Sequence, residues 1–209
     1  WDPVMPEESQ QLSLHFCKVR RQSETFCKPL AIEDYGLQAV AETSPAKWHL
    51  AHTSWFFETF LLQPFATNYQ VFNAQFAYLF NSYYNGIGSQ YPRSKRGLLS
   101  RPVVEEVYRY RQHVDQAMLA LLNCPHPAEA EIHKRVQLGI HHEQQHQELF
   151  FTDLKYNLFQ NPLYPAYCTS SNAPHQNSCA TESELEFIPF NGGLVTVGCE
   201  HENAFHFDN

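Results

Sequence analysis

The residues best suited to chemistry lie in one octet, His141-His142-Glu143-Gln144-Gln145-His146-Gln147-Glu148. Residues four apart on a helix lie one above the other, so His142 and His146 can direct two imidazoles at one metal ion. Two buried neutral rings on the same helix face would each need a polar partner, and a metal ion supplies one for both. The octet therefore predicts a metal site.

A third metal ligand must come from another part of the chain. His52 lies on the apolar face of a second predicted helix, whereas His49, its competitor, falls toward the edge of that face. A lone buried histidine more often just packs, but together with His142 and His146 we expect His52 to be a ligand. Three neutral nitrogens leave open positions on a divalent ion, as a catalytic site requires. Imidazole suits zinc, nickel and iron(II), so the ligand set does not choose among them.

The octet also contains the HExxH pattern of zinc metalloproteases, in which Glu143 would be the general base. This pattern is short and matches often by chance. A metzincin would place a glycine and a third histidine further along, where this chain has Leu149 and Thr152. We therefore regard the protease interpretation as the weaker one.

Four segments with helical periodicity must position these histidines. They are expected over 7–27, from Ser44-Pro45 to about 62, over 102–123 and over 127–158, with Ser44 and Ser100 as N-caps. Between the second and third helices, residues 64–101 are aromatic and irregular, which predicts a long functional loop. The predicted fold class is mainly α.

A domain boundary is expected after the fourth helix. Residues 1–160 would form the helical domain with the metal site, and residues 161–184 have the Pro, Ser, Asn and Thr content of a linker. Residues 185–209 would then begin a truncated second domain, with two short strands around the turn Asn191-Gly192-Gly193. Because the first residue is Trp1, we also expect the chain to be a piece of a longer protein.

Composition narrows the function classes. The chain has 209 residues, 43% of them hydrophobic, and a formal net charge of −8 with both signs interspersed. Nucleic-acid binding relies on clustered Lys and Arg, so small-molecule partners are favoured. No membrane-spanning run or signal peptide is apparent, which favours a cytoplasmic protein, and six cysteines without CxxC spacing predict reduced thiols.

Four motifs in this order resemble the ergothioneine biosynthesis sulfoxide synthases, the EgtB family. They are 44–52 (SPAKWHLAH), 79–84 (LFNSYY), 93–102 (RSKRGLLSRP) and 141–148 (HHEQQHQE). The resemblance covers nearly the whole chain and implies a DinB-like four-helix bundle. The segment 187–193 (FIPFNGG) is similar to the start of that family's second domain, which has the formylglycine-generating, sulfatase-modifying-factor-like fold.

The resemblance implies a non-haem iron(II) oxidoreductase with iron on His52, His142 and His146. The reaction would use O2 to join the sulfur of a cysteine-type thiol, gamma-glutamylcysteine or cysteine, to the imidazole C2 of hercynine, giving a sulfoxide. Gln145 would help to hold hercynine, and Arg93 and Arg96 would bind the carboxylates of the thiol substrate. For the two arginines, ordinary surface charge in a loop is the alternative.

The catalytic tyrosine of the family would lie in the part of the second domain that this chain lacks. We therefore expect the chain alone to bind metal at most weakly and to turn over little or not at all. A second hypothesis is a stand-alone DinB-like metal-dependent thiol transferase or hydrolase with zinc or nickel, and a third is a non-enzymatic helical interaction module. The sequence does not indicate the oligomeric state.

Overall fold

The chain is mainly helical in the computed structural model, which describes residues 7–82, 86, 88–168, 185–199 and 205–207. The elements in chain order are α1 (Glu7–Cys27), the 3-10 helix η1 (Ile32–Gly36), α2 (Ala46–Phe57), the π-helical turn η2 (Glu58–Leu62), α3 (Gln63–Phe65), α4 (Phe76–Leu79), the 3-10 helix η3 (Arg93–Leu98), α5 (Val104–Leu122) and α6 (Glu129–Phe159). No strand occurs in these described ranges. The chain divides into two units, 1–168 and 169–209.

The four predicted helices are confirmed. α1 has the predicted bounds, and α5 and α6 begin and end within two residues of the predicted ones. The predicted N-caps are wrong: Pro45 precedes α2 and Val103 precedes α5, and neither helix has a side-chain cap. The hydroxyl of Ser44 instead accepts a hydrogen bond from Nη1 of Arg96 at 2.9 Å.

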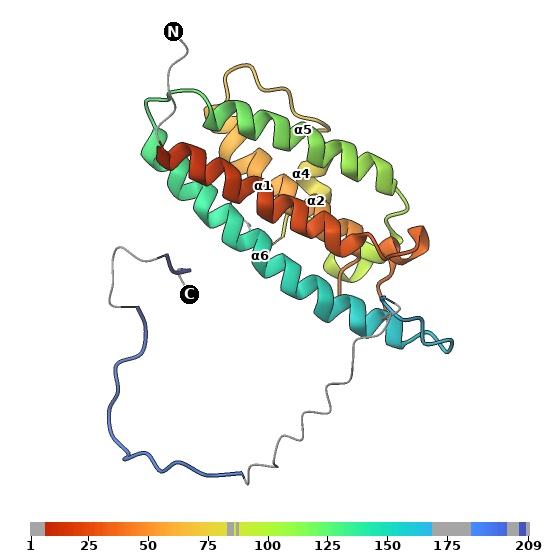
Figure 1. Ribbon diagram of the computed structural model, residues 1–209. Helices are drawn as coiled ribbons and strands as arrows, with labels where there is room; N and C mark the ends of the chain where they lie inside the picture. Colours follow the sequence, from red (N-terminus) through yellow and green to blue (C-terminus); the bar gives the residue numbers. More distant parts are fainter. Residues whose placement is uncertain (1–6, 83–85, 87, 169–184, 200–204, 208–209) are drawn as a thin grey trace. The chain divides into compact units, whose positions relative to one another are not determined.

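Helices α1, α2, α5 and α6 run side by side (Figure 1), and buried apolar side chains from all four contribute to the hydrophobic core. α1 packs against α5 and α6, and α2 also packs against both of them. All twelve residues of α2 are buried. A helix that is covered on every side lies inside the protein, so α2 is the central element and its side chains meet those of its neighbours.

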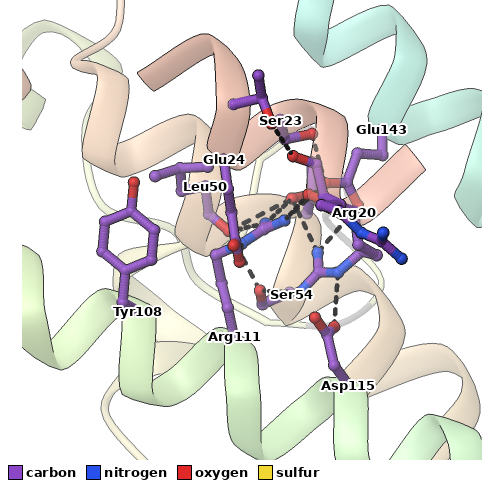
Figure 2. A network of polar contacts seen from close by, with 12 residues as sticks. Arg20, Ser23, Glu24, Leu50, Ser54, Tyr108, Arg111, Asp115 and Glu143 are labelled. Atoms are coloured by element: carbon purple, nitrogen blue, oxygen red, sulfur yellow. Dashed lines mark hydrogen bonds and ion pairs between the residues drawn. The ribbon is translucent and has the colours of Figure 1, made fainter. Parts of the chain in front are cut away.

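A buried ionic network joins three of these helices (Figure 2). Glu143 of α6 accepts Nη1 of Arg20 from α1 at 2.9 Å and Nη2 of Arg111 from α5 at 2.9 Å. Ser23 donates its hydroxyl to the same carboxylate at 2.7 Å, and Arg20 also pairs with Asp115 at 2.6 Å. Because the carboxylate is surrounded by donors, the charge of Glu143 is compensated away from water.

The same arginines reach the backbone and hydroxyls of α2. Nη1 of Arg111 donates to the carbonyl oxygen of Leu50 at 2.9 Å, and Nη2 of Arg20 donates to the hydroxyl of Ser54 at 2.7 Å. Thr53 lies between the two guanidinium groups and accepts from Nη1 of Arg111 at 3.0 Å. The network therefore fixes α2 relative to α1, α5 and α6.

The segment 64–101, predicted as a loop, contains the end of α3 and the short helical elements α4 and η3, and it is held to the helical core. Nζ of Lys47, a buried lysine of α2, donates to the carbonyl oxygens of Leu99 and Pro102. Nε1 of Trp48 donates to the carbonyl oxygen of Leu79 at 3.2 Å. Residues of α2 thus anchor the middle of this segment and its C-terminal end. Tyr83 and Tyr84 of the predicted aromatic motif lie outside the described residues.

The two strands predicted around Asn191-Gly192-Gly193 are not found: residues 185–199 have no strand or helix. Their large apolar side chains are almost fully exposed, namely Leu185, Phe187, Ile188, Phe190, Leu194, Val195 and Val197. An isolated two-stranded hairpin is marginally stable in water, because it has nothing against which to bury an apolar face. The linker predicted over 161–184 is described only up to residue 168.

No helix in the described part of the chain is both long and apolar enough to cross a membrane.

Candidate metal centre

His52, His142 and His146 lie together and could hold a metal ion. Each offers one ring nitrogen, and these three nitrogens lie within 4.8 Å of one another. His52 comes from α2, and His142 and His146 come from successive turns of α6. These are the three histidines that the spacing of the sequence selected, and of the described residues only they form such a group.

His52 is held in a defined orientation. Its Nδ1 lies 2.6 Å from the carbonyl oxygen of Phe80, and a carbonyl only accepts, so Nδ1 carries the proton and Nε2 keeps its lone pair. The ring is stacked between two tryptophans, with ring centroids 4.5 Å from Trp48 and 5.4 Å from Trp55. Packing and hydrogen bonding therefore both direct Nε2 as the ligand atom of His52.

His146 uses Nδ1 in a hydrogen bond with Nδ1 of His49, at 3.0 Å, which leaves Nε2 for a metal ion. His49 is buried and its Nε2 lies 3.1 Å from Oδ2 of Asp153, also on α6. His49, the alternative ligand considered from the sequence, is therefore not in the cluster but contacts one of its members, His146. The sequence placed His49 toward the edge of the apolar face of α2, but in the structure it is buried like His52.

His142 provides the test of whether the site suits a metal ion. It is buried, and its Nδ1 has no hydrogen-bond partner among the described residues. A buried nitrogen without a partner costs free energy, which a coordinated metal ion would recover. The residues present therefore fit a divalent ion that binds imidazole.

The electrostatics of the site favour neutral rings. Burial lowers the pKa of His142 to about 4, although the nearby charge of Glu143 acts to raise it. Burial also lowers the pKa values of His52 and His146 well below the ordinary value, and the neighbouring histidines and Arg96 lower them further. Neutral imidazole is the form that binds metal, so the three ligands are ready at neutral pH.

Glu143 does not have the properties of a general base. Burial acts to raise its pKa, but the charges of Arg20 and Arg111 and the Ser23 hydroxyl lower the pKa to about 2. Its side chain is 1% exposed and both carboxylate oxygens accept hydrogen bonds. A carboxylate this tightly bound is a poor proton acceptor, which argues against a protease built on the HExxH pattern.

Arg96 lies next to the site, whereas Arg93 and Gln145 are exposed. Arg96 is buried, its guanidinium carbon lies 3.4 Å from the ring centroid of Trp48, and it donates to the hydroxyls of Ser44 and Ser82. Arg93 donates to the carbonyl oxygen of Glu42. Gln145 lies on α6 directly before His146.

Comparison with known proteins does not assign this chain to a family. No protein-family description matches the sequence. No curated protein matches it either.

Proposed function

We propose that this chain is the metal-binding domain of an oxygen-dependent non-haem iron sulfoxide synthase, with a DinB-like four-helix bundle and the start of a second domain. The three-histidine cluster of His52, His142 and His146 is the observation that carries the proposal. A three-histidine cluster could serve several kinds of metal enzyme. The four motifs that resemble the EgtB family, found in the same order, favour this function among them. Hercynine, a cysteine-type thiol and O2 would be the substrates.

Iron(II) held by three neutral histidines would have open positions and would supply the oxidative chemistry. The protein's own part is to orient the ligands. His52 is fixed by the Phe80 carbonyl and by two tryptophans, and the paired charges of Glu143 with Arg20 and Arg111 hold α6 against α1 and α5. Such support limits the movement of the ligands during a reaction.

Arg96 and Arg93 would bind the carboxylates of the thiol substrate, as the resemblance implies. The position of Arg96 supports this role, because its guanidinium stacks on Trp48, and Trp48 stacks on the ligand His52. A carboxylate bound there would bring its substrate close to the metal. Gln145 would contact hercynine from α6, one residue before His146.

Anaerobic titration of the 209-residue chain with iron(II), followed by metal analysis, tests the metal site. We expect weak binding that approaches one iron per chain at high iron(II) concentration, and loss of this binding in His142→Ala. His141→Ala is the matched control, because His141 is the neighbouring histidine of the same helix and is not in the cluster. Iron binding that survives in His142→Ala would contradict the site, and strong preference for zinc or nickel would favour the stand-alone thiol transferase or hydrolase.

Aerobic incubation of the iron-loaded chain with hercynine and each thiol, with mass spectrometry of the products, tests the reaction. We expect little or no sulfoxide from this chain alone, because the proposed second half of the active site is not within it. A longer reading frame that includes a second domain is expected to form the sulfoxide in the same assay. Absence of product from that longer protein would contradict the proposed reaction, and robust turnover by the shorter chain would contradict the need for a second domain.

A further inference from the structure

His49 connects the metal ligand His146 to a buried carboxylate. Nδ1 of His49 lies 3.0 Å from Nδ1 of His146, and Nε2 of His49 lies 3.1 Å from Oδ2 of Asp153. The same Oδ2 accepts the backbone N–H of Ser44 at 2.8 Å. Because His49, Asp153 and Ser44 are all buried, water does not compete well for these bonds.

The carboxylate of Asp153 determines which ring nitrogens of His49 and His146 carry a proton. An ionised carboxylate only accepts hydrogen bonds, so Nε2 of His49 carries a proton and donates a hydrogen bond to Asp153. When His49 carries this one proton, its Nδ1 has a lone pair and accepts the Nδ1 proton of His146. Nε2 of His146 then keeps the lone pair that a metal ion requires.

The opposite arrangement would block the site. If the single proton of neutral His49 were on Nδ1 instead, Nδ1 would donate to Nδ1 of His146, and the proton of neutral His146 would reside on Nε2. No lone pair would remain on His146 for a metal ion. The position of one proton on His49 thus decides whether His146 can be a ligand.

We propose that His49 and Asp153 are positioning residues that set the tautomer of His146 and present its Nε2 to the metal ion. The inference rests on the proposed metal site and is independent of the sulfoxide synthase reaction. It gives His146 the kind of support that the Phe80 carbonyl gives His52. A carboxylate that acts on a ligand through a second imidazole is an extension of the usual carboxylate–histidine–metal arrangement.

The tautomers can be observed directly in the metal-free chain. Long-range 1H–15N correlation spectra of the imidazole nitrogens distinguish a protonated nitrogen from one with a lone pair. We expect the proton of His146 on Nδ1 and that of His49 on Nε2. A spectrum with the proton of His146 on Nε2 would overturn the proposal, and this measurement requires neither a variant nor a metal ion.

Variants of His49 test the consequence for metal binding, measured with cobalt(II) by its absorption spectrum. His49→Phe keeps a planar ring but removes both nitrogens, and we expect the dissociation constant to rise about 10- to 100-fold. His49→Gln retains one acceptor and one donor and should lose less. His15→Gln, at an exposed histidine of α1, is the control and should bind as the unchanged chain does.

The outcomes separate the inference from the proposed site. A folded His49→Phe protein, checked by circular dichroism, that binds cobalt(II) as tightly as the unchanged chain would overturn the inference. If His49→Phe does not fold, the tautomer spectrum of the unchanged chain still decides. If the unchanged chain binds no metal ion, the proposed site fails, while the spectrum of His146 still tests the relation among the three residues.

Discussion

Gly139 of α6 lies directly against the ring of Phe57 on α2, so that a Cβ atom at position 139 would fall 2.5 Å from Cε1 of Phe57. The same atom would fall 3.0 Å from Cε1 of Phe56. Both rings are buried and cannot move away easily. The absence of a side chain at Gly139 therefore allows α2 to approach α6 closely, about one turn before His142.

We expect Gly139→Ala to destabilise the protein by about 1–3 kcal/mol through overpacking, although alanine is the better helix former by about 1 kcal/mol. Urea unfolding measures the change. Gln137→Ala, at an exposed position of α6, is the control and should be neutral or slightly stabilising. Combining Gly139→Ala with Phe57→Leu should restore part of the loss, and strictly additive effects of the two changes would contradict the contact.

Loss of the charge of Glu143 should reduce stability strongly. In Glu143→Gln, the guanidinium groups of Arg20 and Arg111 remain buried without their shared carboxylate, at a cost of about 3–5 kcal/mol. The midpoint of urea unfolding at pH 7 reports this cost. Glu148→Gln is the matched control on the exposed side of α6 and should change stability by less than about 0.5 kcal/mol.

The stability of the metal-free protein should fall as the pH is lowered from 7 to 5. The folded-state pKa of His142, about 4, lies below the ordinary value of 6.5. Below pH 6.5 the unfolded chain therefore binds a proton that the folded chain does not, and the stability associated with neutral His142 decreases by about 2 kcal/mol by pH 5. Urea unfolding at pH 7, 6 and 5 with a chelator measures the slope, which should be shallower in His142→Phe. An equal slope in the two proteins would show that His142 is not buried as a neutral ring.

Removal of the ammonium group of Lys47 should loosen the segment that carries Arg96. Nζ of Lys47 donates to the carbonyl oxygens of Leu99 and Pro102, which hold the segment to α2. In Lys47→Met we expect faster hydrogen exchange at the amides of Lys95 and Leu99, which form the turns of η3. Lys95→Met, at an exposed lysine of the same segment, is the control for exchange at Leu99. Unchanged protection in Lys47→Met would mean that η3 is held by other contacts.

The helices and the three clustered histidines could be predicted because both follow from periodic spacing. An apolar period of 3.6 gives α1, α5 and α6 nearly to the residue, and a spacing of four places His142 above His146. His52 was separable from His49 because its position lies nearer the centre of the apolar face. Such information is local to one helix and is present in the sequence.

The partners of buried polar groups could not be predicted in this way. Glu143 stands in an HExxH pattern, yet it pairs with Arg20 and Arg111, which are distant in the sequence. Asp153 lies on the same helix, just after the octet, and nothing in the sequence around it predicts its contact with His49. Which donor meets which acceptor depends on the packing of separate helices, and periodicity within one helix carries no record of it.

The complete burial of α2 would make binding of a metal ion by the three histidines specific to the folded protein. His52 lies beside His142 and His146 only when α2 is packed against α1, α5 and α6, so an unfolded or partly folded chain would offer no equivalent site. An ion present at one hundred times its dissociation constant would then add about 2.7 kcal/mol to the free energy of unfolding. A metal ion would thus bind only to molecules in which α2 is fully packed, and would stabilise them relative to molecules in which α2 is still exposed.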